Sequence, residues 1–315
     1  MSRLLTSLSD FPADLQGGSV AIGNFDAVHL GHAALVRELI RSSDRVGGPA
    51  IVFTFDPPPG AVLNPLKPLI KPLTSIARRA ELMHTLGVDA LIAYPTQPSF
   101  LNLTAREFFD QIVVEKLAAR AMVEGPNFRF GRGREGDIAT LKKMCQASGV
   151  QLHVMEIVQC DSQNVSSTRI RELVTLGEIA TANSMLFEPY SIEGEVVTGA
   201  QRGRTIGFPT ANLDSIAVLL PAFGVYAGRV LGIGPSPLAA AVHIGSSPTF
   251  GEDQPKVEVH LINWHGALYG ETLTVEILQR VRGTQQFSSA DELKKQLHLD
   301  VQTCIKFVAE YAQTQ

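Results

Sequence analysis

One change of pattern, near residue 186, restricts the folds that this chain can adopt. Before it, short apolar runs alternate with amphipathic stretches of helical length. This alternation predicts right-handed βαβ units that build a doubly wound parallel sheet. The predicted strands are residues 20–22, 50–55, 90–94, 121–123 and 152–158. The predicted helices are residues 32–42, 75–86, 105–117, 138–148 and 167–186.

Beyond Tyr190 the chain is rich in Gly, Val and Thr and falls into short alternating runs. Many short strands separated by Gly and Pro turns predict a small antiparallel β-barrel. We therefore expect an α/β domain over residues 1–186 and a barrel domain over residues 187–315, each with its own core. The predicted barrel strands are residues 191–197, 224–230, 239–244, 256–263 and 272–278.

Capping patterns support several of these helices. Thr104-x-x-Glu107 reads as a capping box for the third helix, and Asp137 is placed to cap the fourth. Ser289-x-x-Glu292 predicts the start of a final amphipathic helix that reaches Ala312. We expect this last helix to pack on the barrel.

Composition excludes several classes of protein. The chain is 45% apolar and 18% charged, which is ordinary for a globular protein, and its net charge of −4 argues against a dedicated nucleic-acid or membrane binder. The scattered cysteines Cys145, Cys160 and Cys304 predict neither a disulfide framework nor a zinc site. With no leader-like or membrane-spanning apolar run, we expect a cytoplasmic protein. These features leave the oligomeric state open.

The stretch most informative about function follows the first predicted strand and reads Gly23-Asn24-Phe25-Asp26-Ala27-Val28-His29-Leu30-Gly31-His32. It lies where a strand turns into a helix, and a helix N-terminus offers unpaired N–H groups and the positive end of a dipole. His29 and His32 are one helical step apart and face the same way, while Gly31 allows close backbone approach. This arrangement predicts a grip on a triphosphate. The alternative is a pair of capping or core histidines.

Two later loops also suit phosphate. Residues 127–134 interleave arginines, which grip phosphate oxygens bidentately, with glycines that free the main-chain N–H groups; the alternative is a solvated basic loop. Residues 166–171 place hydroxyls at a helix start before two arginines, and the alternative is a plain N-cap. Together the three loops predict ATP bound with its α-phosphate open to in-line attack. Its charge would be stabilised by His29, His32, Arg169 and Mg²⁺.

The predicted barrel carries a second polar cluster. Residues 199–212 form a Gly- and Arg-rich segment that ends in Pro-Thr-Ala-Asn. Thr210 and Asn212 are two apart, so on a strand both side chains point to one face and can hold Mg²⁺ and phosphate together. Glu258 alternates with two valines, and its carboxylate can accept the proton of an attacking hydroxyl. The alternative for Glu258 is an ordinary outward-facing strand residue.

On these motifs the chain closely resembles the bacterial bifunctional riboflavin kinase/FMN adenylyltransferase family, the FAD synthetases. The resemblance is carried by Phe-Asp-x-Val-His-x-Gly-His followed by Gly-Phe-Pro-Thr-Ala-Asn, and it covers nearly the whole length. It implies a nucleotidyltransferase domain over residues 1–186 that converts FMN and ATP to FAD and pyrophosphate. It also implies a kinase domain over residues 187–315 that converts riboflavin and Mg²⁺-ATP to FMN.

The resemblance further implies roles for individual residues. In adenylyl transfer, His29, His32 and Arg169 would be catalytic. ATP and its phosphates would be held by Gly23, Asn24, Phe25, Asp26, Gly31, Asn127, Arg132, Ser167 and Thr168. In the kinase, Glu258 would be the base, and Thr210 and Asn212 would hold Mg²⁺. ATP and flavin would be held by Gly203, Arg204, Gly207, Pro209, Thr210 and Asn212.

The chain departs from the family pattern at a few positions. Ala27 stands where the family usually has Gly, and we expect the added methyl group to matter little. His243 and Ser247 replace Asn, Phe187-Glu188 replaces Gly-Arg, and Thr284 replaces an acidic residue. An alternative is therefore an FMN adenylyltransferase whose barrel binds flavin as a regulator with reduced or lost kinase activity. Other His-x-Gly-His adenylyltransferases lack such a barrel, and a class I aminoacyl-tRNA synthetase would need a longer chain and a Lys-rich signature loop.

Overall fold

The computed structural model describes residues 3–63, 66, 70–199, 203, 207–247 and 252–313. The chain divides into two compact units, which we describe separately. The first contains residues 1–70 and 75–166, and the second contains residues 71–74 and 167–315. Among the described residues, no helix has the length and apolar character needed to cross a membrane.

The first unit is built on a parallel sheet of six strands in the order β1-β4-β3-β2-β5-β6. Each predicted strand of this half is present, although β6 ends at Val154 instead of residue 158. An edge strand, β1, pairs with β4 and was not predicted, because three residues are too few for a period to show. The strands are β1 Arg3–Leu5, β2 Ser19–Ile22, β3 Ala50–Asp56, β4 Ala90–Pro95, β5 Ala121–Glu124 and β6 Gln151–Val154.

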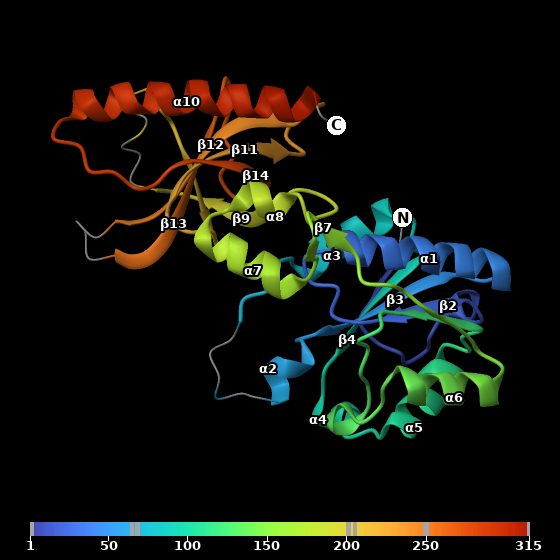
Figure 1. Cartoon of the computed structure of the whole chain (residues 1–315). Helices are drawn as coiled ribbons and strands as arrows, with labels where there is room; N and C mark the ends of the chain where they lie inside the picture. Colours follow the sequence, from blue (N-terminus) through green and yellow to red (C-terminus); the bar gives the residue numbers. More distant parts are fainter. Residues whose placement is uncertain are drawn as a thin grey trace. The chain divides into compact units, whose positions relative to one another are not determined.

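Helices cover both faces of this sheet, which confirms the doubly wound prediction (Figure 1). The capping box of Thr104 and Glu107 and the cap at Asp137 are both present. The predicted helix 105–117 begins as α5 but continues as a π-helix over Phe109–Lys116. The α-helices are α1 Leu30–Val46, α2 Pro59–Leu63, α3 Ile76–Thr85, α4 Pro98–Leu101, α5 Ala105–Phe108 and α6 Ile138–Ser148.

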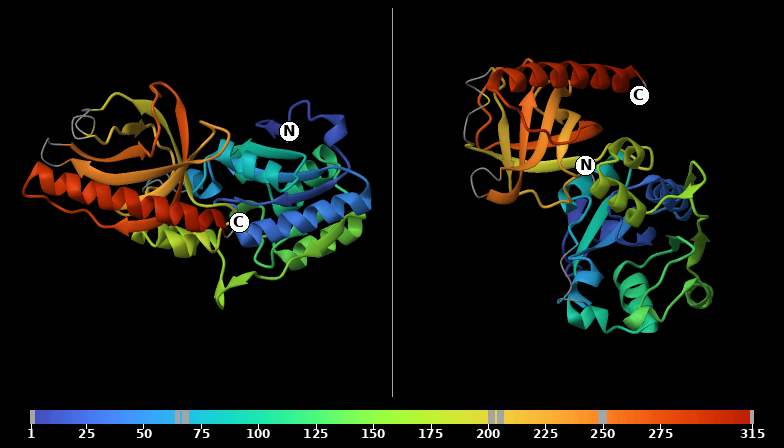
Figure 2. Two further views of the ribbon diagram at one scale, coloured as in Figure 1. Left: turned by 90° about the horizontal axis from the view of Figure 1, so that it is seen from above. Right: turned by 60° about the vertical axis from the view of Figure 1, so that its left-hand side comes forward.

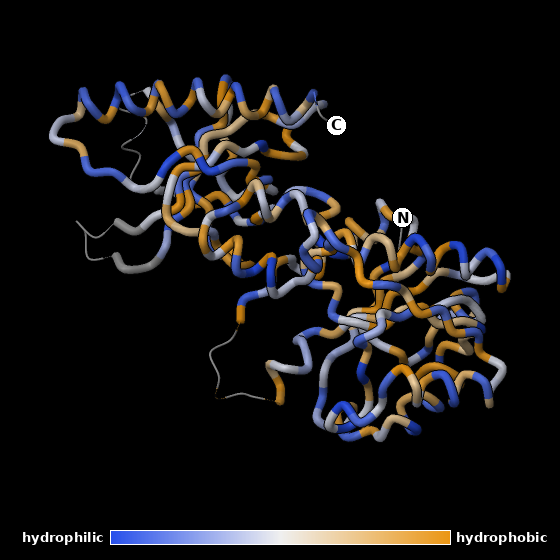
Figure 3. Tube along the Cα trace, in the orientation of Figure 1, coloured by the Kyte–Doolittle hydropathy of each residue, from blue (hydrophilic) through white to orange (hydrophobic). Residues whose placement is uncertain are grey.

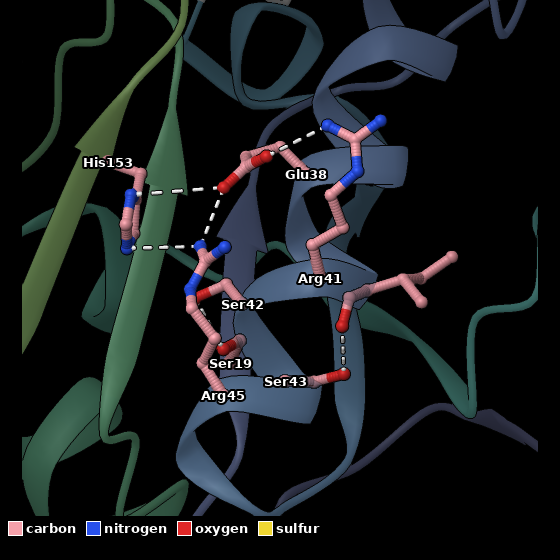
Figure 4. A network of polar contacts seen from close by, with 8 residues as sticks. Ser19, Glu38, Arg41, Ser42, Ser43, Arg45 and His153 are labelled. Carbon is pink, nitrogen blue, oxygen red and sulfur yellow. Dashed lines mark hydrogen bonds and ion pairs between the residues drawn. The ribbon is translucent and has the colours of Figure 1, made fainter.

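Helix α1 is anchored to the sheet by polar contacts as well as by apolar packing (Figure 4). The Glu38 carboxylate accepts hydrogen bonds from Arg41 and Arg45, and Arg45 also contacts His153 on β6. Near its C-terminal end, the buried Ser42 hydroxyl accepts a 3.0 Å hydrogen bond from Ser19 on β2. The contacts of Arg45 with β6 and of Ser42 with β2 hold α1 at the sheet, so the opposite end of the helix, where the two histidines lie, has a defined position.

The second unit is a closed antiparallel barrel with the strand order β10-β13-β12-β11-β14-β9, which confirms the predicted architecture. Strand β9 has the predicted bounds, whereas β12, β13 and β14 differ from them by up to four residues at an end. A short two-stranded ribbon, β7 Gln159–Cys160 with β8 Gln163–Asn164, belongs to the first unit. The barrel strands are β9 Ser191–Val197, β10 Ala211–Asp214, β11 Gly224–Leu231, β12 Leu238–Ser247, β13 Glu252–Leu261 and β14 Thr272–Arg282.

The described residues of the second unit also form helices. Helix α10, Ala290–Gln313, lies along the outside of the barrel (Figure 2). Its Cys304 is buried in an apolar cluster with Ala227. Apolar and polar residues alternate along α10, as expected for a helix with one covered face (Figure 3). The predicted helix 167–186 was wrong as a single helix, because it breaks at Gly177 into α7 Ser167–Leu176 and α8 Ile179–Asn183. Gly177 is in the left-handed region at φ 77°, which ends a helix.

Candidate functional site

The parallel sheet opens between β2 and β5. These strands are the neighbours from which the strand order runs in opposite directions, and ligands of such sheets bind outside the carboxyl ends at this point. Only Ser19 and Val20 pair with β5. Beyond them, the Ile22 N–H donates to the Glu124 carboxylate at 2.9 Å. At the end of β2, the Glu124 side chain therefore takes the place of a backbone hydrogen-bond partner on β5.

The loop that leaves β2 has an unusual backbone. Phe25, Ala27 and Val28 all adopt positive φ, at 47°, 74° and 43°. Such conformations cost a non-glycine residue about 1–2 kcal/mol and favour Gly. Ala27 therefore does more than add a methyl group where the family usually has Gly: it places a Cβ in the left-handed region. The expectation that alanine at position 27 matters little is therefore corrected, because its backbone conformation favours glycine.

His29 and His32 come together at the start of α1. His29 is the N-cap, and its Nδ1 accepts a 3.2 Å hydrogen bond from the His32 N–H, so the capping alternative is present in the structure. The two rings stack with their centroids 3.6 Å apart and an interplanar angle of 14°. A Cβ at Gly31 would lie 3.1 Å from the His29 ring, so Gly at this position leaves room for the imidazole.

Burial makes both imidazoles weak bases. It lowers the pKa of His29 to about 4. Burial, then the neighbouring His29 ring and the Arg79 charge, holds the pKa of His32 well below its ordinary value. Both rings are therefore neutral at physiological pH. Because His29 Nδ1 accepts the backbone N–H, its proton is assigned to Nε2, which can donate to a ligand. Buried His32 Nδ1 has no hydrogen-bond partner among the described residues.

The arginine-rich loop after β5 borders an open cleft of about 370 Å³. Asn127 lines this cleft, as the phosphate-binding prediction requires, and Arg129 contacts the Asp137 cap of α6 at 3.6 Å. Arg132 is an exposed residue of a short 3₁₀ turn and does not line the cleft. The cleft is lined by Pro126, Asn127, Arg129, Arg134, Asp137, Ile138 and Ala139.

The third predicted phosphate loop opens helix α7. Ser167, Thr168 and Arg169 form its first turn, and Arg169 Nη1 pairs with Glu172 at 3.3 Å on the same helix. The structure groups these residues with the second compact unit, whereas the sequence interpretation placed them in the first domain. Their role in adenylyl transfer, and the domain boundary at residue 186, stay predictions.

The polar residues of the barrel lie on neighbouring strands in register. Asn212 on β10 is directly opposite Glu258 on β13, and Glu258 is directly opposite His243 on β12. Opposed residues of an antiparallel pair share one face, so an amide, a carboxylate and an imidazole form one row. Burial lowers the pKa of His243, and the Glu258 charge acts in the opposite sense. Thr210 directly precedes β10 instead of lying on it.

Glycines bring backbone close to this row. A Cβ on Gly199 would lie 2.2–2.6 Å from the side-chain amide of Asn212, so only Gly can occupy that position without displacing it. A Cβ on Gly203 would lie 2.2 Å from the Phe208 carbonyl oxygen. Gly207 is in the left-handed region at φ 90°. Arg204 lies outside the described residues.

Phe208 and Pro209 are held by contacts from several elements. The Phe208 N–H donates to the Gly203 carbonyl at 2.8 Å, and the Phe208 ring packs edge-on against His260 of β13 and His298 of α10. His260 Nδ1 also lies 2.8 Å from the Pro209 carbonyl oxygen. Phe208 and Pro209, the latter predicted to bind ATP or flavin, therefore contact the strand that carries Glu258.

Several residues at these sites were missed from the sequence. Glu124 lies just beyond the predicted strand 121–123 but is the last residue of β5, and its carboxyl is buried, which raises its pKa well above the usual range. Arg79 is 3% exposed and contacts the loop after β2. His260 and His298 pack against Phe208, and His260 also contacts the Pro209 carbonyl oxygen. A charged residue in an apolar strand or on the apolar face of a helix is the signal that marks the first two.

Comparison with known proteins identifies the class of each half. Residues 11–169 match the FAD synthetase family, and residues 186–308 match the riboflavin kinase family. The class is therefore an α/β nucleotidyltransferase unit joined to a riboflavin kinase barrel in one chain. None of the described residues forms a cluster of three or more His, Cys, Asp and Glu suited to a metal ion.

Whole-chain relatives agree with this assignment. The bifunctional riboflavin kinase/FMN adenylyltransferase of Escherichia coli (strain K12) is 35% identical over 97% of this chain and 96% of that protein. The one from Listeria monocytogenes is 34% identical over 92% of both. A crystal structure named as a macrolide-efflux protein from Streptococcus pneumoniae is 29% identical, with a TM-score of 0.85 over 96% of this chain and 98% of that one. The chain belongs to the bifunctional riboflavin kinase/FMN adenylyltransferase family.

Proposed function

We propose that the two units perform consecutive steps of FAD formation. The barrel phosphorylates riboflavin to FMN with ATP, and the α/β unit transfers an adenylyl group from a second ATP to FMN, releasing pyrophosphate. The proposal is carried by one observation: the chain holds two built polar sites, the stacked His29–His32 pair at a helix start and the Asn212–Glu258 pair on adjacent strands. Ser167, Thr168 and Arg169 are assigned to adenylyl transfer by resemblance.

In the kinase step, the 5′-hydroxyl of riboflavin attacks the γ-phosphorus of ATP and ADP leaves. Glu258 is the carboxylate that accepts the hydroxyl proton, a contribution typically worth about 10²–10⁴-fold. Its position opposite Asn212 supports this role, because Asn212 Oδ1 and the Thr210 hydroxyl are oxygen donors of the kind that Mg²⁺ prefers. The close approach of Gly199 to the Asn212 amide fits a site where backbone and phosphate lie together. Bound Mg²⁺ neutralises phosphate charge.

In the adenylyl step, a phosphate oxygen of FMN attacks the α-phosphorus of ATP, and the bond to the pyrophosphate oxygen breaks. Neutral His29 and His32 donate hydrogen bonds to the triphosphate, while the first N–H groups of α1 and its dipole favour the same anion. The low pKa of His29 supports a role as a hydrogen-bond donor and not as a general acid. A ring with a pKa of about 4 is almost entirely unprotonated at neutral pH, so it has no proton to transfer. Asn127 and its cleft offer room beside this unit's arginine-rich loop.

One incubation tests both steps. Purified protein with riboflavin, ATP and Mg²⁺ should yield FMN and then FAD on chromatography, and chelation of Mg²⁺ should stop both. A second incubation that supplies FMN directly isolates the adenylyl step. Failure to form FAD from FMN would remove the adenylyltransferase assignment.

The same incubations decide the alternative in which the barrel is a flavin-binding regulator. His243 and Ser247, where the family usually has Asn, are the observations that favour it. In that case the protein binds riboflavin and forms no FMN, yet makes FAD from supplied FMN. We place the reactions in the cytoplasm, since the few, scattered cysteines of the sequence suit a reducing compartment.

A further inference from the structure

The loop over residues 23–28 needs an external support. Three of its non-glycine residues, Phe25, Ala27 and Val28, adopt positive φ, and the loop leads directly into the His29 cap. Strained backbone of this kind persists only where surrounding contacts over-determine it. Phe25 packs its ring against His32, with centroids 5.0 Å apart, so the conformation of the loop affects the position of the imidazole pair.

Arg79 supplies such contacts from helix α3. Its Nη1 donates to the Asn24 carbonyl oxygen at 2.8 Å and to Thr54 Oγ1 at 3.2 Å, and its Nη2 lies 3.3 Å from Asp26 Oδ1. The Thr54 hydroxyl on β3 donates to the same Asn24 carbonyl at 2.9 Å. The guanidinium group thus joins a helix, a strand and two residues of the strained loop.

Arg79 is 3% exposed and Asp26 has little exposure, so this is a buried ion pair. A buried charge is costly unless good geometry and further hydrogen bonds compensate it. Two of the acceptors of Arg79, Asn24 O and Asp26 Oδ1, belong to the loop. The contacts of Arg79 therefore stabilise this conformation of the loop, and the loop is the part of the unit next to the imidazoles.

We propose that Arg79 is a positioning residue for adenylyl transfer, which holds the 23–28 loop in the conformation that aligns His29 and His32 with the triphosphate. It does not touch the reacting atoms. The planar fork of arginine is required, because its two terminal nitrogens serve different acceptors; a lysine offers one point charge and cannot reproduce this geometry. The proposal rests on the proposed adenylyl transfer in this unit.

The test compares Arg79→Lys with wild type and with Arg41→Lys, an arginine on α1 whose side chain is 67% exposed and pairs with Glu38. FAD formation from supplied FMN is measured at varied ATP, and FMN formation from riboflavin serves as the internal control in the same chain. Misplacement by about 1 Å can cost 10²-fold in rate. We expect kcat for FAD formation to fall by about 10–100-fold in Arg79→Lys, with KM for ATP changed by less than about threefold.

Thermal unfolding separates positioning from loss of folded protein, because the variant must be native at the assay temperature for the kcat change to count. If Arg79→Lys does not fold, Thr54→Val tests the same loop: it keeps the side-chain shape, removes the hydroxyl shared by Arg79 and Asn24, and should lower kcat about 3–10-fold. Arg41→Lys should match wild type in every assay.

Two outcomes would overturn the proposal. One is wild-type kcat for FAD formation in folded Arg79→Lys or, where that variant does not fold, in Thr54→Val. The other is a rise in KM with unchanged kcat, which would make Arg79 a contributor to ground-state binding. Absence of FAD formation in the wild-type protein is a different result, since it rejects the adenylyltransferase assignment itself.

Discussion

The candidate phosphate sites of the two units are built in different ways. In the α/β unit the candidate site is made at the end of a strand, by a strained loop, a helix start and two neutral imidazoles. In the barrel, the candidate residues lie side by side on adjacent antiparallel strands, so strand register sets their spacing. The first design depends on contacts from outside the loop, such as Arg79. The second depends on a row of pairings that the whole barrel maintains.

This difference predicts how each site fails. A loop site can lose its alignment while the core stays folded, because the loop conformation is held by a few side chains. A site whose spacing is set by strand register keeps its alignment as long as the barrel closes. Only substitution of the reactive group itself should then impair it strongly. The predictions below use one unit as the control for the other.

The largest effect is expected for Glu258→Gln. Glutamine keeps the volume and a hydrogen-bonding oxygen but cannot accept the riboflavin proton, so FMN formation should fall by about 10²–10⁴-fold. Riboflavin binding, followed by fluorescence, should persist, and FAD formation from supplied FMN should match wild type. Phosphorylation at the wild-type rate would make Glu258 an ordinary strand residue.

Loss of either imidazole should reduce only the other reaction. A single donor aimed at developing charge is typically worth about 10²–10³-fold in kcat, so His32→Ala should lower FAD formation by this factor and leave FMN formation intact. His29→Ala also loses the cap of α1, worth about 0.5–2 kcal/mol. His29→Asn keeps a capping oxygen, so it isolates the loss of the donor. Unchanged FAD formation in His32→Ala and His29→Asn would contradict the site.

Separate expression tests the modularity of the barrel. A fragment of residues 187–315 should phosphorylate riboflavin and form no FAD. A longer fragment, residues 167–315, should be more stable by about 2–4 kcal/mol, because it retains buried Ile179 of α8 and the Asn183 hydrogen bonds to Ile277 and Tyr190. Denaturant unfolding measures the difference, and Asn183→Ala in the longer fragment should lose part of it. A folded short fragment that is inert toward riboflavin would reject either the boundary or the kinase assignment.

Glu124 makes the α/β unit sensitive to pH. Burial raises its folded-state pKa well above the unfolded value, so the unfolded chain releases this proton first and stability falls as pH rises from about 4.5 toward the folded pKa. The slope is at most about 1.4 kcal/mol for each pH unit. Glu124→Gln keeps an acceptor for the Ile22 N–H and should raise stability at pH 7.5. Urea unfolding at several pH values tests this, with exposed Glu115→Gln as a control that should show no such gain.

The smallest expected effect is at Ala27. Ala27→Gly relieves the left-handed backbone at φ 74° and should stabilise the α/β unit by about 1 kcal/mol. Ala80→Gly in helix α3 removes a side chain from ordinary helical backbone and should destabilise the unit by about 1 kcal/mol. Opposite signs in thermal unfolding would confirm the strain, whereas equal losses would show that the loop accommodates alanine without cost.

The amino-acid sequence by itself determined the architecture of this protein and was enough to predict its two candidate sites. Alternating periods predicted the parallel sheet and the barrel, because burial of one face imposes period 2 on strands and about 3.6 on helices. The cap at Asp137, the box at Thr104 and Glu107, and the common face of His29 and His32 follow from local geometry within a few residues. Such features are visible in sequence because their partners are near in the chain.

Tertiary structure alone decided which residues, distant in the sequence, contact the two candidate sites. Arg79 reaches Asn24 across 55 positions, and Glu124 reaches Ile22 across 102 positions. The row of Asn212, Glu258 and His243 exists only because three strands pair in one register. No local pattern specifies these contacts, since they depend on how whole elements pack. At Gly177 both kinds of cause act: the left-handed backbone that ends α7 is local, whereas the Tyr226 hydroxyl of the barrel, which would lie 2.8 Å from a Cβ, leaves no room for a side chain.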